Sequence, residues 1–346
     1  MDDLTKSFLR QKFSKYYSKY KPFIPREIEK REWGFINFDG IMIRHISLSN
    51  ELELKGFLAK NPPLHAYYSS AYYKKPEANM EEKEWIKADL IFDIDADHLP
   101  KGGLKTAKRQ ITRLYDLLEE DFGCKDMIIV FSGSRGYHIH VYDEDFQQLG
   151  SQERREIVDY FYLNGISFRE ILPKAPQYLR LSDCMVRRLK SLIKRGELEK
   201  YLGLKRKVPE LEEIILRKEL REGDFTSIPK RILEKLPLFF EECVNRSRVY
   251  IDPPVTSDIK RLIRLPNSIH GKTSLRVTPI KRDEIDEFDP QRDAIAFDND
   301  LTKVRVIRKV KFKLKDTEFR LEKGNHKLPE FAALYLICRG VARYGW

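Results

Sequence analysis

The stretch LIFDIDAD at residues 90–97 decides the fold. Apolar residues precede and separate its acids, a pattern typical of a buried strand whose carboxyl end carries carboxylates. Because side chains alternate along a strand, Asp93 and Asp95 share one face and Ile94 lies on the other. Two carboxylates so close repel each other unless a cation lies between them, so the pair indicates a divalent metal site.

Mg²⁺ or Mn²⁺ suits this pair of acids, since both ions prefer oxygen ligands and often complete their coordination with substrate phosphates. A D-x-D pattern also arises by chance about once in a chain of this length. The metal interpretation therefore depends on what lies downstream of the strand.

The loop at 132–136, Ser-Gly-Ser-Arg-Gly, follows a helix expected over 104–118 and joins strands expected at 127–131 and 137–142. Its amides and its guanidinium can cradle phosphate oxygens. In the second strand His138 and His140 are two residues apart and share one face. Taken alone, the loop fits a plain hairpin with solvated polar residues better, and the metal strand nearby reverses that preference.

The remaining patterns predict an α+β protein with mixed sheets. A helix is expected from Leu4 to Tyr17, a hairpin around Asp39-Gly40 and a strand at 65–73. Residues 151–247 are expected to be mostly helical and 249–252 to form a strand. Residues 303–314 are expected to form a strand or hairpin with a slip near 307–308. We therefore expect a catalytic core at 1–146, an inserted helical subdomain at 147–247, and the second part of the core, with basic strands and a last helix, at 248–346.

Composition narrows the class of protein. The 346 residues are 41% hydrophobic, which excludes wholesale disorder. Lys and Arg number 65 against 54 Asp and Glu, so a polyanionic partner is plausible, although a heat-adapted surface has a similar charge content. The four cysteines form no C-x-x-C pair, and no run of about 18 apolar residues occurs. We expect a cytoplasmic protein without a membrane segment.

Three blocks in this order resemble the small catalytic subunit of archaeal and eukaryotic DNA primases: FDID at 92–95, SGSRGYH at 132–138 and RLIRLPNSIHGKT at 261–273. The resemblance extends from about residue 32 to residue 298. It implies a mixed-sheet catalytic core and a metal-dependent nucleotidyltransferase that makes short RNA, or also DNA, primers de novo during DNA replication. It also implies three partners: single-stranded DNA template, ribonucleoside or deoxyribonucleoside triphosphates, and a primase large subunit.

The resemblance also assigns site residues. Metal ligands correspond to Asp93, Asp95 and a third acid at Asp252, with Asp258 as the fallback, and the expected cofactor is Mg²⁺ or Mn²⁺ in a two-metal site. The expected nucleotide-binding residues are Ser132, Arg135, His138, Arg264, His270, Lys272 and Arg44. Ser134 departs from a family position that is often basic. Because no Cys/His loop follows the acids, we expect the structural zinc of many family members to be absent.

Three other functions compete with this interpretation. A repair polymerase or primase-polymerase of the same superfamily would extend existing ends without de novo synthesis. A D-x-D glycosyltransferase would use Mn²⁺ to hold a nucleotide diphosphate and would hydrolyse sugar nucleotides. A non-catalytic basic nucleic-acid module would tolerate loss of all three acids.

Overall fold

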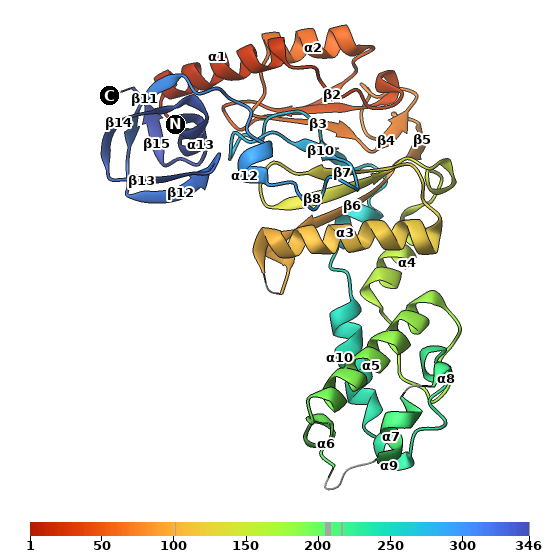
Figure 1. Ribbon diagram of the computed structural model, residues 1–346. Coiled ribbons are helices and arrows are strands. Elements are labelled where there is room, and N and C mark those ends of the chain that lie inside the picture. The colour runs from red at the N-terminus through yellow and green to blue at the C-terminus, as the bar shows by residue number, and fades with distance from the viewer. Residues whose placement is uncertain (101, 205–208, 216, 346) are drawn as a thin grey trace. The chain divides into compact units, whose positions relative to one another are not determined.

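The computed structural model describes residues 1–100, 102–204, 209–215 and 217–345 (Figure 1). Its contacts divide the chain into two compact units, Met1–Arg155 with Ile251–Trp346, and Glu156–Tyr250. The predicted α+β class is confirmed. The predicted divisions after residues 146 and 247 fall near these boundaries, and the functional meaning of the segments stays a prediction. Within the described residues, no helix is both long enough and apolar enough to cross a membrane.

The first sheet of the larger unit has the strand order β2-β1-β3-β9, with every neighbouring pair antiparallel. Its strands are β1 (Trp33–Ile36), β2 (Met42–Ile46), β3 (His65–Ser69) and β9 (Leu262–Arg264). Helices α1 (Asp3–Lys19) and α2 (Glu51–Lys60) lie along it in Figure 1. The ring centre of Phe57 in α2 lies 4.6 Å from that of Phe35 in β1, and the ring centre of Phe13 in α1 lies 5.4 Å from that of Phe38. Aromatic contacts therefore hold the two helices against this sheet.

The second sheet has the order β10-β7-β8-β6 and is also antiparallel throughout. Its strands are β6 (Leu90–Asp95), β7 (Met127–Phe131), β8 (Gly136–Val141) and β10 (Thr278–Ile280). Helix α3 (Gly103–Phe122) runs along this sheet in Figure 1 and buries Ile111, Leu114 and Leu118. Gly123 ends the helix with a positive φ of 69°, a conformation that glycine adopts without strain.

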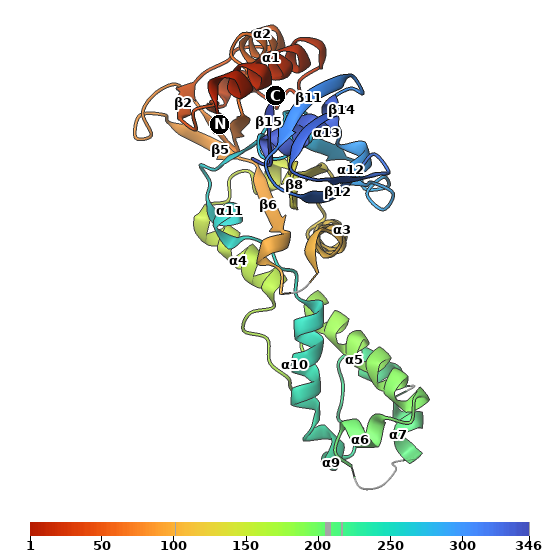
Figure 2. The ribbon, with the colours of Figure 1, turned by 90° about the vertical axis from the view of Figure 1, so that its left-hand side faces the viewer.

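The C-terminal strands correct one prediction. Residues 303–314 do not form a single strand with a slip, because β11 (Leu301–Val306) and β12 (Val310–Leu314) belong to different sheets. At the break, Ile307 N–H donates to the carbonyl of Val341, and the chain then turns away. Strand β11 lies between β14 (Gly324–Pro329) and β15 (Ala342–Tyr344), while β12 pairs with β13 (Thr317–Leu321). Helix α13 (Glu330–Cys338) is drawn beside these strands in Figure 2.

Two further strand predictions were wrong in detail. Residues 65–73 split at Ser70 into β3 and β4 (Ala71–Tyr73), and β4 pairs instead with β5 (Trp85–Ala88). Residues 249–252 form no strand; Asp252 is the N-cap of the short helix α11 (Pro253–Ser257). The two prolines that follow have no N–H to donate to a sheet, whereas proline suits the first turn of a helix.

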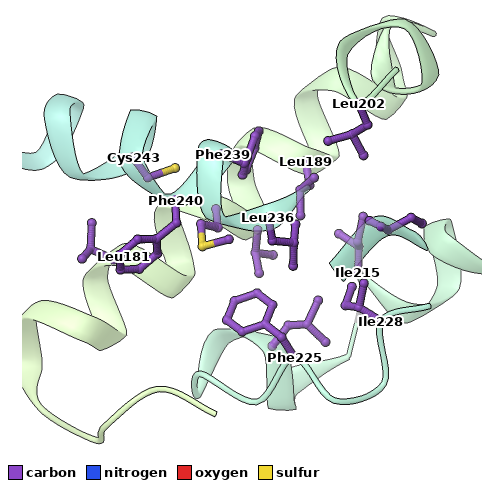
Figure 3. Close-up of a cluster of buried hydrophobic side chains, with 14 of the residues drawn as sticks. Leu181, Leu189, Leu202, Ile215, Phe225, Ile228, Leu236, Phe239, Phe240 and Cys243 are labelled. Carbon is purple, nitrogen blue, oxygen red and sulfur yellow. The ribbon is translucent and has the colours of Figure 1, made fainter. Parts of the chain in front are cut away.

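The second unit is helical, as predicted for this segment. Its main helices are α5 (Pro176–Lys194) and α10 (Leu236–Ser247), and its shorter ones are α6 (Leu198–Tyr201), α7 (Pro209–Ile214), α8 (Lys218–Arg221) and α9 (Lys230–Leu233). Figure 3 shows Leu181 and Leu189 of α5 facing Phe239 and Phe240 of α10 in one apolar cluster. Helix α4 (Ser151–Tyr162) crosses the boundary between the units, and the remaining short elements are η1 (Ile28–Lys30), η2 (Ala96–His98), η3 (Glu144–Phe146) and α12 (Pro290–Asp293).

Candidate active site

Three acidic residues gather around strand β6 in the larger unit. Asp93 and Asp95 lie on this strand, and Asp93 is directly opposite His138 of β8. The backbone N–H of Asp252 donates to the carbonyl of Asp93 at 2.8 Å, which brings the start of α11 against β6. Ile94 is fully buried, whereas the side chain of Asp93 keeps 21% of its surface exposed. The two strand acids therefore face away from the core, as the alternation predicted.

The charge of this cluster is unbalanced. Burial, and then the carboxylates of Asp95 and Asp252, raise the pKa of Asp93 from 3.8 to about 7, although Arg261 and Arg264 act in the opposite direction. Among the described residues, no group of three or more His, Cys, Asp or Glu side chains is already close enough to hold a metal ion. Carboxylate oxygens are the donors that Mg²⁺ and Mn²⁺ prefer. The residues present fit such an ion.

His138 is a neutral neighbour of the acids. Burial, helped by Arg264 and Arg261, lowers the pKa of His138 to about 3, so its 3.5 Å approach to Asp93 is not an ion pair at neutral pH. Its Nδ1 atom is buried and has no hydrogen-bond partner within the part of the chain that the structure describes. A buried ring nitrogen without a hydrogen bond costs stability.

The loop between β7 and β8 is closed by its own hydrogen bonds. Ser132 N–H donates to the carbonyl of Gly136 at 3.0 Å, and Gly136 N–H donates to Ser132 Oγ at 3.2 Å. Gly133 has a φ of +84°, and a Cβ atom there would lie 2.6 Å from the Cβ of His270. Only glycine therefore lets the loop approach the 270–273 segment this closely.

The guanidinium of Arg135 is exposed at this loop. Its Nη1 lies 2.8 Å from Asp97 Oδ2, and both side chains keep about half or more of their surface in solvent. An exposed ion pair contributes little stability, so Arg135 can exchange this carboxylate for a phosphate at small cost. Arg135 is thus compatible with the predicted role.

Arg264 at the end of β9 is held in place by two neighbours. Its Nη1 donates to His65 Nδ1 at 2.8 Å, and its guanidinium lies 5.1 Å from the centre of the Tyr67 ring. Burial lowers the pKa of His65 to about 3, so this imidazole is neutral and can accept the bond. His270 is 4% exposed, and its ring centre lies 4.9 Å from that of His65. This packing orients Arg264 beside the acids.

Thr273 links the two nucleotide-binding segments predicted from the sequence. Its Oγ1 donates to the carbonyl of Gly133 at 2.6 Å, which ties the 270–273 segment to the 132–136 loop. Lys272, one residue earlier, is exposed. The predicted nucleotide-binding residues other than Arg44 therefore lie on adjoining segments of one unit.

Arg44 and Asp258 lie differently from the others. Arg44 forms two hydrogen bonds with the buried carboxylate of Glu32, at 3.0 and 3.2 Å, so its charge is paired within the protein. Asp258 lies at the other end of α11 from Asp252, and its carboxylate accepts a bond from Lys260 N–H. Of the two candidates for the third acid, Asp252 has a backbone hydrogen bond to Asp93. The roles of Asp252 and Arg44 stay predictions.

Sequence reasoning missed His65 and Tyr67, which position Arg264. Both lie in the run His-Ala-Tyr-Tyr at 65–68, which reads as an ordinary aromatic strand. Their spacing of two residues places them on one face of β3, but only the pairing of β3 with β9 brings that face to Arg264.

Comparison with known proteins gives a consistent result. The family model for the DNA primase small subunit matches residues 92–282. A DNA primase small subunit PriS from Archaeoglobus fulgidus is 44% identical over 99% of both chains, and one from Methanococcoides burtonii is 38% identical over 100% of both chains. Among solved structures, the polymerase domain of Mycobacterium tuberculosis Ligase D in complex with DNA covers 83% of the chain and 86% of its own, at 14% identity and a TM-score of 0.43.

Proposed function

Because the chain belongs to the family of DNA primase small subunits, we propose that Asp93, Asp95 and Asp252 hold the divalent cations of primer synthesis. The chain is a DNA-directed nucleotidyltransferase of DNA replication, and the alternatives of an end-extending repair enzyme or a glycosyltransferase are not favoured. The placement of Asp252 against Asp93, on the strand that also carries Asp95, is the observation that carries the metal assignment, and the raised pKa of Asp93 agrees with it. These three carboxylates would hold Mg²⁺ or Mn²⁺, which would supply Lewis-acid activation of the attacking 3′-hydroxyl and charge neutralisation at the departing pyrophosphate.

The cationic and imidazole side chains position the incoming nucleotide. Arg135 and Lys272, with the amides of the 132–136 loop, bind the triphosphate. Arg264 balances the charge that develops at the α-phosphate, because His65 and Tyr67 hold its guanidinium in place. The neutral rings of His138 and His270 offer N–H donors, and together these contacts keep the α-phosphate in line with the attacking hydroxyl.

The partners follow from the family. We propose that the chain works in a heterodimer with a primase large subunit, which carries an iron–sulfur cluster in this family, and that it binds single-stranded DNA template through its basic surface. The net charge of +11 supports electrostatic binding of the template backbone. A cytoplasmic location and the absence of structural zinc remain predictions, and metal analysis of the purified protein after mild chelation tests the latter.

Primer synthesis by acid variants tests the assignment. The purified chain, alone and with its large subunit, is incubated with unprimed single-stranded DNA, all nucleotides and Mg²⁺ or Mn²⁺. We expect Asp95→Asn and Asp252→Asn to lower the rate by roughly two orders of magnitude or more. New oligonucleotides made only by the unmodified chain support the proposal.

Asp258→Asn is the matched control, since this residue lies on the same short helix and was the alternative third ligand. It should keep near-normal activity and should bind Mn²⁺, measured by electron paramagnetic resonance, as tightly as the unmodified chain. Equal loss of activity and of Mn²⁺ binding in the Asp258 variant, with Asp252→Asn unaffected, would reverse the assignment of the third acid.

A further inference from the structure

A cavity of about 540 Å³ opens beside the 132–136 loop. Its walls come from segments far apart in the sequence: the loop itself, residues 272–275, the first residues of α3 and α12, and the ends of β12 and α13. Sites for small ligands commonly enclose roughly 300–1,000 Å³, so the volume suits a ligand of nucleotide size or part of one.

The charged side chains that line the cavity are cationic. Among the residues that the structure describes, Arg135, Lys272 and Arg339 line it and no Asp or Glu does so. Within the described part of the chain, neither Lys272 nor Arg339 is within 4.0 Å of a carboxylate oxygen. Arg339 instead donates to the hydroxyl of Tyr335 at 3.0 Å and lies 5.3 Å from its ring centre, which orients the guanidinium without neutralising it. The wall is therefore suited to an anion with several charges.

Direct contacts join this wall to the site described above. Cys338 and Arg339 at the end of α13 line the same cavity as Lys272 and Thr273. The hydroxyl of Thr273 donates in turn to the carbonyl of Gly133 in the loop. Arg339 thus belongs to the same cluster of segments as the predicted nucleotide-binding residues, although it lies near the other end of the chain.

Backbone hydrogen bonds occupy carbonyls at the end of α13. Gly340 has a φ of +67°, and its N–H donates to the carbonyl of Ile337 at 2.9 Å. Val341 N–H donates to the carbonyl of Leu336 at the same distance. Arg339 is the charged side chain that this end contributes to the cavity.

We propose that Arg339 is a further phosphate-binding residue of the nucleotide site, and that it binds the β- and γ-phosphates of the incoming nucleoside triphosphate in this cavity together with Arg135 and Lys272. The inference rests on the proposed function of the adjoining acids. A triphosphate concentrates three to four negative charges within a few ångströms, which matches three convergent cations, whereas a DNA backbone presents one charge per phosphate along an extended path. Apolar walls at Leu275 and Leu314 strengthen these contacts by lowering the local dielectric constant.

The first test measures extension of an annealed primer by Arg339→Gln. We expect the KM for the nucleotide to rise roughly tenfold, while kcat changes less than about twofold, because a phosphate contact is lost and the acids are untouched. Arg308→Gln is the matched control: Arg308 is also exposed, lies in the same unit and does not line the cavity. An unchanged KM in Arg339→Gln would overturn the proposal.

The second test separates this inference from the proposed function. Inorganic tripolyphosphate is titrated into the full chain in the presence of chelator, so binding is measured without metal and without catalysis. Arg339→Gln should weaken binding roughly tenfold, whereas Asp95→Asn should not weaken it. If the acid variants kept primer synthesis, the metal assignment would fail. The tripolyphosphate affinity of Arg339→Gln would still test whether Arg339 binds phosphate in the cavity. Unchanged tripolyphosphate affinity in Arg339→Gln, or a loss confined to single-stranded DNA affinity or to the initiating nucleotide, would refute the inference.

Discussion

Replacing Asp93 by Asn should stabilise the metal-free protein while abolishing its activity. Burial and the carboxylates of Asp95 and Asp252 raise the pKa of Asp93 to about 7. Above about pH 7 the folded apoprotein therefore carries this carboxylate in its ionised form, which lowers the free energy of unfolding. Asparagine has nearly the same shape and no charge. The variant should therefore lose repulsion and, with it, a proposed metal ligand.

The size of the effect follows from the pKa. A rise from 3.8 to about 7 corresponds to about 4 kcal/mol, at about 1.4 kcal/mol for each factor of ten in proton affinity. We expect about half of this, about 2 kcal/mol, since the side chain keeps 21% of its surface exposed and neighbouring groups can relax. For a cooperative unit of about 250 residues, that is roughly 4–8 °C in Tm.

The stability difference between Asp93→Asn and the unmodified chain should depend on pH. A carboxyl whose pKa is higher in the folded than in the unfolded state favours folding fully below pH 3.8, and this contribution is lost as pH rises through about 7. In chelator, the variant and the unmodified chain should therefore differ little near pH 4, and the difference should grow to its full value near pH 8. Saturating Mg²⁺ or Mn²⁺ should stabilise the unmodified chain at pH 8 and affect Asp93→Asn much less.

Thermal melting in chelator between pH 4 and pH 8 makes the measurement, with primer synthesis assayed in parallel. Asp300→Asn is the control, because this aspartate is exposed and its substitution should leave Tm unchanged at every pH. If Asp93→Asn were no more stable than the unmodified chain at pH 8, or if the difference did not depend on pH, the idea of a repelling carboxylate cluster would be refuted.

Three further outcomes are expected. Gly133→Ala should raise the nucleotide KM about tenfold in primer extension, because a Cβ at a φ of +84° would lie 2.6 Å from the Cβ of His270 and would displace the loop. An unchanged KM would show that the loop does not bind the triphosphate. Arg31→Met should cost about 3–5 kcal/mol in urea unfolding, because it leaves the fully buried carboxylate of Asp89 unpaired, whereas Arg26→Met, at an exposed ion pair, should cost less than about 1 kcal/mol. Affinity for single-stranded DNA should fall at least about tenfold when salt rises from about 50 to about 500 mM, and a flat titration would exclude electrostatic binding of the template.

Local patterns in the sequence predicted most of the fold. The alternation around 90–97, the helical periodicity over 104–118 and the Asp39-Gly40 turn each gave the observed element, since a few neighbouring residues set these periodicities. The predictions failed where the partner strand decided the outcome. Residues 65–73 and 303–314 each continue as extended chain but change sheets midway. The slip near 307–308 marked the second break, but no local pattern showed which strand each part would pair with.

The features of the candidate site likewise fall into those set by neighbouring residues and those set by tertiary packing. The sequence by itself determined that Asp93 and Asp95 share a face and that Ser132 and Arg135 lie in a loop between strands, because these relations depend only on residues close together in the chain. Only the tertiary structure decided that Asp252 lies against Asp93, that Glu32 neutralises Arg44 and that Arg339 lines a cavity with Lys272. The electrostatic environment of a charge depends on whatever packing brings within a few ångströms of it, and those neighbours come from anywhere in the chain.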